Sequence, residues 1–184
     1  IPKCNWIDYL GYFFVKNVKF NMGNETIEEI NDHIIYTYNR RRTDSSKEEG
    51  INEMIGHNCY LQMPQTTIKG KILYIPLPVG FEKESCALPL QALMNTILNL
   101  NVTIRNLDNL IVRNPDTEIK LLSKTKVELN LTYVFLEDEA RAKFARSRHE
   151  YLYEIKHCYE HVIEKQEDDI LLEYENPCKE ISWF

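Results

Sequence analysis

The chain of 184 residues is long enough for one domain, or for one domain and part of another. Its apolar content of 43% and charged content of 27% are those of a folded, soluble protein. The net charge of −6 offers no electrostatic footprint for nucleic acid or for an anionic membrane, so direct binding to either is not expected.

The five cysteines are dispersed, and no two form a CxxC pair, which predicts free thiols in a reducing compartment. The sequence has neither an apolar run of about 18 residues nor a charged and then apolar leader, so we expect no transmembrane helix and no signal peptide. The chain begins with Ile1 and ends in the apolar run Ile181–Phe184. We therefore expect it to be a piece of a longer protein.

The first part of the chain predicts a β-hairpin followed by a helix. Residues 18–22 alternate between apolar and polar side chains, and the Gly-Asn pair at 23–24 suits a two-residue turn. A capping box at residues 26–29 would favour a helix that starts there instead. We prefer a hairpin with a short second strand and a helix from about residue 31 to residue 41.

Residues 40–42 are all arginine. The cluster is short and is followed by acids, so cations at a helix C-terminus explain it better than a nucleic-acid patch does. After it we expect a polar loop over Thr43–Gly50, a brief apolar turn over Ile51–Gly56 and an irregular connection over Asn58–Gly70.

The centre of the chain predicts two strands. Ile72–Val79 is apolar, and Pro76 and Pro78 point the same way, which places the end of this strand at a sheet edge or a bend. In Thr96–Arg105, leucine, valine and isoleucine alternate with polar residues, the period of a strand with one buried and one wet face. The chain is therefore β-rich at its centre.

The last third predicts one more strand, a helix and short strand-like runs. Val127–Phe135 has the most regular alternation in the sequence, so we expect one of its faces to be buried. Residues 137–139 are acidic and open a helix whose later residues are basic, the order that the helix dipole favours. Further strand-like runs occupy residues 151–155, 170–174 and 181–184.

Catalytic and metal-binding patterns are weak. His157 and His161 have the spacing of two zinc ligands on one helix face, but no second ligand pair occurs and HExxH is absent. Cys86 lies in ESCALP, without the glycine-rich or helix-opening context that would activate a thiol. We therefore expect no catalytic residues, no metal and no cofactor.

Three N-x-S/T sequons occur, at Asn24, Asn101 and Asn130. Asn101 and Asn130 lie on the polar faces of predicted strands, where bulky glycans would compete with packing. Without a secretory signal we interpret the sequons as chance occurrences, and they stand only as candidate N-glycosylation sites.

Several stretches, in this order, resemble the major capsid proteins of nucleocytoplasmic large DNA viruses, the group of iridoviruses, asfarviruses, phycodnaviruses and giant viruses. The most recognisable is KILYIPLPVGFEKESCALPLQALMNTILNLNVTIR, where a proline-ended strand leads through an ALPL turn to an alternating strand. The other stretches are WIDYLGYFFVKNVKFNMGNETIEEINDHIIYTYNRR, EGINEMIG, VELNLTYVFLEDEARAKFARSRHEYLYE and DDILLEYENPCKEISWF. The chain departs from the family after Pro78, where Val79 and Gly80 stand in place of aromatic residues.

This resemblance implies an all-β fold with short connecting helices: most of the first jelly-roll β-sandwich of a double jelly-roll protein. Residues 1–160 would form that first jelly roll without its first strands, and residues 161–184 the linker and the start of the second. Proteins of this family form trimers of pseudo-hexagonal outline that tile an icosahedral shell around an internal membrane. We therefore expect a late structural protein of the virion, assembled in the host cytoplasm and without enzymatic activity.

The resemblance also implies partners: a homotrimer, neighbouring capsomers and minor capsid proteins, with no direct contact to nucleic acid and only indirect contact with the internal viral membrane. Exposed aromatic and arginine side chains would form the interface, and the candidates are Trp6, Tyr9, Arg40, Arg41 and Arg42. Two alternatives stay open. One is a monomeric β-sandwich module that binds carbohydrate, and the other is a zinc- or thiol-dependent enzyme that uses His157, His161 or Cys86.

Overall fold

The computed structural model describes residues 3–66, 70–81, 86–93, 95–114, 117–118, 124–163, 167, 169–172 and 175–183. Its strands are β1 (Cys4–Trp6), β2 (Val15–Met22), β3 (Glu25–Asn31), β4 (Leu98–Ile104) and β5 (Ile111–Arg113). Its α-helices are α1 (Leu10–Phe14), α2 (Asp32–Arg42), α3 (Glu48–Ile55), α4 (Cys59–Gln62) and α5 (Asp138–Arg146). Antiparallel sheets and helices are thus mixed, and the expectation of an all-β fold overstated the strand content.

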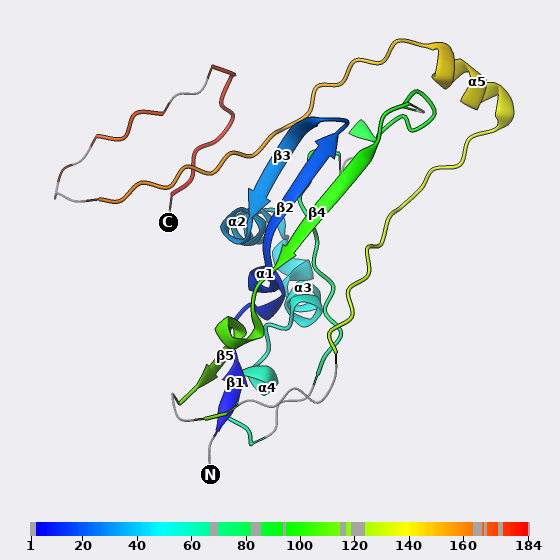
Figure 1. Ribbon diagram of the computed structural model, residues 1–184. Coiled ribbons are helices and arrows are strands. Elements are labelled where there is room, and N and C mark those ends of the chain that lie inside the picture. The colour runs from blue at the N-terminus through cyan, green and yellow to red at the C-terminus, as the bar shows by residue number, and fades with distance from the viewer. Residues whose placement is uncertain are drawn as a thin grey trace.

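A three-stranded antiparallel sheet, ordered β3-β2-β4, forms the main body, while β1 and β5 pair in a separate ribbon near the N-terminus (Figure 1). The predicted hairpin is confirmed, because β2 and β3 pair and Gly23 turns between them with a φ of +62°. The second strand has seven residues and is not short, and the proposed capping box at 26–29 lies within it. The central alternating strand is confirmed as β4, which pairs with β2, but its predicted buried face is not, because none of its seven residues is fully buried.

The core lies between the inner face of this sheet and helices α1, α2 and α3. Its buried side chains are Tyr12, Val15, Val18, Ile30, Ile35 and Ile55. Gly11 of α1 touches the backbone of α3, since a Cβ at this position would lie 2.9 Å from both the Ile55 Cα and the Ile55 O atoms. The close approach of the two helices therefore depends on a residue without a side chain.

Helix α2 matches its prediction at both ends. The Asn31 side chain caps it by accepting a hydrogen bond from the Ile34 N–H at 2.9 Å. Residues 40–42 place three positive charges in the last turn, where the helix dipole favours them.

Helix α3 contradicts the polar loop and apolar turn predicted over residues 43–56. Glu48 and Glu49 fill its first turn, and Gly56, with a φ of +76°, ends it in the left-handed conformation. Ile51 and Ile55 lie one turn apart and pack on the core. Two inward side chains were too few to show helical periodicity in the sequence. The short helix α4 lies within the connection predicted as irregular.

Residues 71–79 form no strand, so the prediction for Ile72–Val79 was wrong in this respect. The Tyr74 N–H donates to the Met54 carbonyl at the end of α3 at 2.9 Å, and Ile75, Leu77 and Val79 pack against the core. The prolines at 76 and 78 remove two of the N–H donors that a ladder needs, and the segment packs across the core instead.

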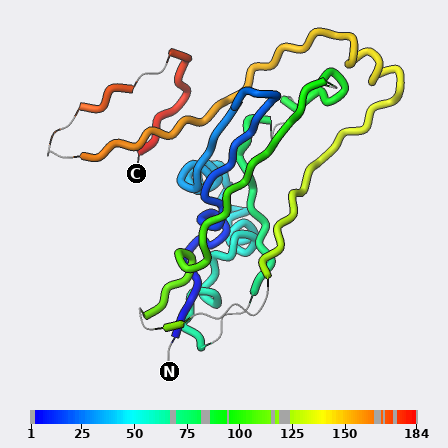
Figure 2. The backbone as a smooth tube through the Cα atoms, viewed as in Figure 1, coloured from blue at the N-terminus to red at the C-terminus, as the bar shows by residue number. Residues whose placement is uncertain are grey.

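Residues 124–137 run as an extended chain apart from the sheet (Figures 1 and 2). This contradicts the prediction that one face of Val127–Phe135 is buried, because every residue in this range is exposed. Among the described residues no strand pairs with the segment, so its amphipathic pattern has nothing to cover it.

The predicted helix after residue 137 is confirmed as α5, with Asp138 and Glu139 in its first turn and Lys143 and Arg146 in its last. The described parts of the three later strand-like runs, residues 151–155, 170–172 and 181–183, form no strand. Residues 173, 174 and 184 of those runs lie outside the described residues. Among the described residues after 158, the first ones lead away from the sheet and the helices (Figure 2), whereas Glu180 lies again beside α2, where it pairs with Arg41.

Candidate interface residues

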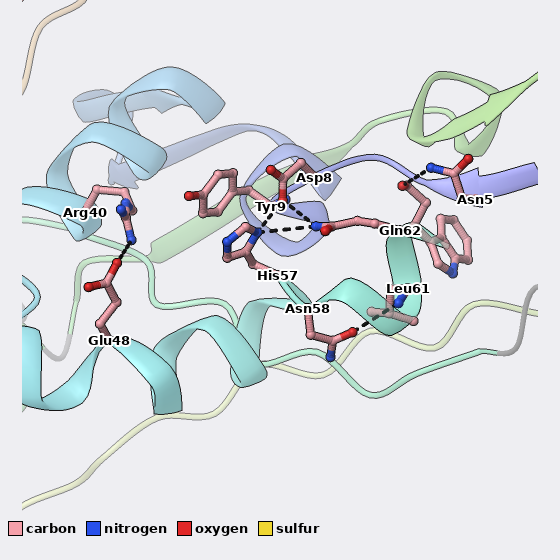
Figure 3. A network of polar contacts seen from close by, with 10 residues as sticks. Asn5, Asp8, Tyr9, Arg40, Glu48, His57, Asn58, Leu61 and Gln62 are labelled. Atoms are coloured by element: carbon pink, nitrogen blue, oxygen red, sulfur yellow. Dashed lines mark hydrogen bonds and ion pairs between the residues drawn. The ribbon is translucent and has the colours of Figure 1, made fainter. Parts of the chain in front are cut away.

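Tyr9 and Arg40 belong to one cluster between α1, α2 and α3 (Figure 3). The Tyr9 ring stacks on His57 with 4.0 Å between centroids and meets Tyr36 edge-on at 5.1 Å. The Arg40 guanidinium carbon lies 5.5 Å from the Tyr9 ring centroid, and its Nη1 donates to Glu48 on α3 at 2.8 Å. Both residues therefore connect helices within the chain.

The electrostatics of this cluster favour neutral phenols and one fixed cation. Burial raises the pKa of Tyr9, although the nearby Arg40 charge lowers it. Burial also raises the pKa of Tyr12, to about 12. The hydrogen bond to Glu48 raises the pKa of Arg40, so this side chain keeps its charge.

Asp8 joins the start of α1 to the chain around α3 and α4 (Figure 3). Its Oδ1 accepts from Gln62 Nε2 at 2.5 Å and from the Tyr9 N–H at 2.8 Å, and it also contacts His57 Nδ1. The same Gln62 nitrogen lies 3.3 Å from His57 Nδ1. This network holds Tyr9 in place, where the backbone has a positive φ of 50°.

Arg41 and Arg42 are exposed at the end of α2 and engage the C-terminal part of the chain. The Arg42 Nη2 atom lies 3.0 Å from Glu154 Oε2, and its guanidinium carbon lies 4.4 Å from the Tyr38 ring centroid. Arg41 pairs with Glu180. In this structure both arginines thus have acidic partners far along the sequence.

Trp6 lies on the separate β1–β5 ribbon, paired in register with Ile111. The residue is half-buried, and its indole Nε1 is buried without a hydrogen-bond partner among the described residues. The structure therefore groups Tyr9 with Arg40, and Arg41 and Arg42 with the C-terminal segment, and places Trp6 on another element.

All three candidate glycosylation sites are exposed. Asn24 lies in the turn of the β2–β3 hairpin, and Asn101 lies on β4 opposite Lys19. Asn130 lies in the extended segment that precedes α5.

Two buried carboxylates were not singled out from the sequence. Asp32, at the start of α2, pairs with Arg105 just after β4, and Arg105 Nε also donates to the Phe13 carbonyl at 3.1 Å. Glu28 lies on the inner face of β3, two residues before the buried Ile30. An acid at an inward position of an alternating strand is the signal that could have identified Glu28.

The described residues hold no cluster of three or more His, Cys, Asp and Glu side chains that could bind a metal ion. His157 and His161 lie in an exposed extended segment, so they do not share a helix face. Cys86 is buried, with its Sγ 3.4 Å from the Leu152 carbonyl oxygen. Across the described ranges, no helix combines the length and the apolar character that a membrane span requires.

A family model described as the major capsid protein N-terminus matches residues 1–137. The chain belongs to this capsid protein family. It is 23% identical to the major capsid protein of Phaeocystis pouchetii virus over 98% of this chain and 41% of that protein. It is 28% identical to the major capsid protein of Trichoplusia ni ascovirus 2c, over 61% of this chain and 24% of that protein.

The major capsid protein of Chrysochromulina ericina virus is 21% identical over 98% of this chain and 38% of that protein. The chain thus spans less than half the length of these three relatives. The matches confirm the resemblance to major capsid proteins of large DNA viruses. Membership of this family, together with the names of these relatives, supports a structural role in a viral capsid.

Proposed function

We propose that residues 1–160 form most of the first jelly roll of a double jelly-roll capsid protein, and that residues 161–184 lead into the second. A jelly roll needs two packed antiparallel sheets. The β3-β2-β4 sheet supplies part of one, and its β4 edge is unpaired among the described strands. On the apolar face of β4, Val102 and Ile104 are still 37% and 41% exposed, so this face needs a further layer.

The observation that carries this proposal is the exposed segment Val127–Phe135, within a family match that reaches residue 137. Its apolar side chains alternate with polar ones from Val127 to Tyr133 and are followed by Val134 and Phe135, and all of these apolar residues are at least half exposed. A segment with this pattern is stable against aggregation only when its apolar face and its backbone groups are covered. We infer that it becomes a strand of the completed sandwich in the intact protein.

At the next level, the proposed unit is a homotrimer that acts as a pseudo-hexameric capsomer in an icosahedral shell, assembled in the host cytoplasm. It would contact neighbouring capsomers and minor capsid proteins, and the internal viral membrane only indirectly. The names of the relatives, all major capsid proteins, support a role in the shell. The proposed interface set is Trp6, Tyr9, Arg40, Arg41 and Arg42, of which Arg41 and Arg42 are exposed.

Light scattering on the intact protein that contains this chain tests the proposed assembly. We expect the mass of three copies, and a stable monomer would contradict the capsomer proposal and favour a self-contained binding module.

A pair of neighbouring substitutions tests the proposed strand. Leu131→Asp places a charge on the apolar side of the segment and should reduce the trimer yield strongly, because burying an unpaired charge is unfavourable. Thr132→Asp, on the polar side, should leave the yield unchanged. Equal behaviour of the two variants in the light-scattering assay would rule out a buried apolar face.

A further inference from the structure

The carboxylate of Glu28 holds two distant segments of the chain at one point. Glu28 lies on β3 opposite Phe20 of β2, and its side chain is 2% exposed. Its Oε2 accepts from the Gly80 N–H at 2.7 Å. Its Oε1 accepts from the Lys156 N–H at 3.2 Å and lies 3.4 Å from Lys156 Nζ. The Lys156 side chain is itself 13% exposed, so both charges are largely removed from water.

Aromatic packing also holds residues 153–156 against the sheet. The Tyr153 ring lies 4.9 Å from Phe81, and Phe81 lies 5.3 Å from Phe20 of β2. A Cβ at Gly80 would lie 3.0 Å from both Tyr153 Cδ2 and the Glu154 carbonyl oxygen. Residues 153–156 therefore fit closely over the turn around Gly80.

A second set of contacts to this part of the chain is exposed. Glu154 pairs with Arg42 at 3.0 Å and with Lys179 at 2.6 Å, and Glu180 pairs with Arg41. Ion pairs between exposed side chains contribute little and are screened by salt. The attachment thus has a buried part at Glu28 and an exposed part at α2.

None of these attachments is a rung of a β-ladder. Residues 152–158 form no strand, and each of these contacts to β3 and α2 involves a side chain: the Lys156 N–H donates to the Glu28 carboxylate, and Glu154 pairs with Arg42. Detaching this segment would leave the pairs β2–β3 and β2–β4 intact, since neither pair includes it. Segments held in this way open at lower free energy than the sheet does.

We propose that residues 152–158 form a detachable strap, anchored at Glu28, and that Arg41 and Arg42 form a salt-sensitive clamp, in which Arg42 holds Glu154 of the strap and Arg41 holds Glu180. When docked, the strap fixes the position at which the chain leaves the sheet. When released, it frees the following residues without unfolding the sheet. The inference concerns how the chain is held and stands independently of the assembly of a shell.

Hydrogen exchange in the intact protein tests the anchor, with the Gly80 and Lys156 amides as reporters. Glu28→Ala should speed exchange at both amides by about tenfold or more, because each loses a buried acceptor, while the amides of β2 and β4 stay protected. Glu29→Ala is the matched control, since Glu29 is the next residue, is exposed and pairs with Lys19. It should leave both reporters unchanged.

A change in salt concentration distinguishes the buried anchor at Glu28 from the exposed ion pairs of Arg41 and Arg42. Raising NaCl from about 0.05 M to about 1 M shortens the Debye length to about 3 Å, so the NMR signals of the Arg41 and Arg42 guanidinium groups should move toward those of unpaired arginine, while exchange at the Lys156 amide stays slow. Fast exchange at Lys156 in high salt, or unchanged arginine signals, would overturn the division into anchor and clamp.

Two further results would overturn the strap itself. One is unchanged exchange at Gly80 and Lys156 in folded Glu28→Ala protein, and the other is equal acceleration throughout the sheet, which would make Glu28 an ordinary core residue. If Glu28→Ala does not fold, the Lys156→Met variant tests the strap instead. It removes the charge but keeps the backbone donor, and it should speed exchange at Gly80, whereas no change there would overturn the proposal.

Discussion

Two segments of this chain share an alternating sequence pattern, but the structure buries one of them and leaves the other exposed. Strand β2 alternates apolar and polar residues, and its Val18 is 1% exposed. The segment Val127–Phe135 alternates more regularly, yet its Leu129 is 53% exposed. Strand β2 lies between β3 and β4 and beneath helices, whereas the later segment pairs with no described strand. Alternation therefore encodes a face that must be covered, but the covering partner lies elsewhere in the chain or in another molecule.

The largest expected loss of stability comes from shortening a core side chain to alanine, and the same change in the exposed segment Val127–Phe135 should have almost no effect. Ile35→Ala, in the core between α2 and the sheet, should lower the free energy of unfolding of the 184-residue chain by about 2–5 kcal/mol, because it leaves a cavity. Leu129→Ala should change it by less than about 0.5 kcal/mol in the same chain. Urea unfolding of both variants measures the difference, and equal losses would show that the later segment is already packed.

Substitutions at two helical glycines, Gly11 in α1 and Gly50 in α3, should have opposite effects on stability. Gly11→Ala should destabilise by about 1–3 kcal/mol, because its Cβ would meet the backbone at Ile55. Gly50→Ala on α3 meets nothing within 4 Å and should stabilise by about 0.5–1 kcal/mol. Thermal unfolding of the two variants should therefore move in opposite directions, and a shared direction would contradict the close contact between α1 and α3.

The buried phenol of Tyr12 should make the stability of the core depend on pH in the alkaline range. Burial raises its pKa from 10.0 to about 12, so the folded state favours the neutral phenol. The stability that this provides is complete below pH 10 and is lost as the pH rises through about 12. Tyr12→Phe should lose less stability over this window than the parent chain does. Parallel unfolding curves between pH 10 and 12 would contradict the burial of this phenol.

The smallest effect belongs to the exposed face of the sheet. Hydrogen bonds from Lys19 and Asn17 lower the pKa of Glu29, so its contribution is present above pH 4.5 and is lost as the pH falls through the folded-state value. Because the pair is exposed, Glu29→Gln should cost less than about 1 kcal/mol near neutral pH. A larger loss in urea unfolding would show that this face is covered.

The sequence alone predicted the elements whose signals are local. The hairpin at Gly23, helix α2 with its cap at Asn31, strand β4 and helix α5 all carry their turn, cap or period within a few residues. Helix α3 was missed because it shows only two inward isoleucines, and the strand at Ile72–Val79 was wrong because prolines and packing on the core outweigh apolar composition. These outcomes depend on contacts between distant residues.

The candidate interface was predicted less well, because the sequence shows residue types but not their neighbours. Tyr9 and Arg40 were singled out as surface anchors, and the structure packs them together between helices. The partners of Arg41 and Arg42 lie more than a hundred residues away in the sequence, at Glu180 and Glu154. Family resemblance supplied the role in the capsid, which spacing and charge alone did not reach.

Hydrogen exchange over Val127–Phe135, compared between the 184-residue chain and the intact assembled protein, tests most directly whether this segment completes the capsid fold. We expect fast exchange in the chain and strong protection in the assembled protein, since the segment would gain both a strand partner and a cover for its apolar face. Fast exchange in both samples would contradict the claim that this segment completes the capsid fold.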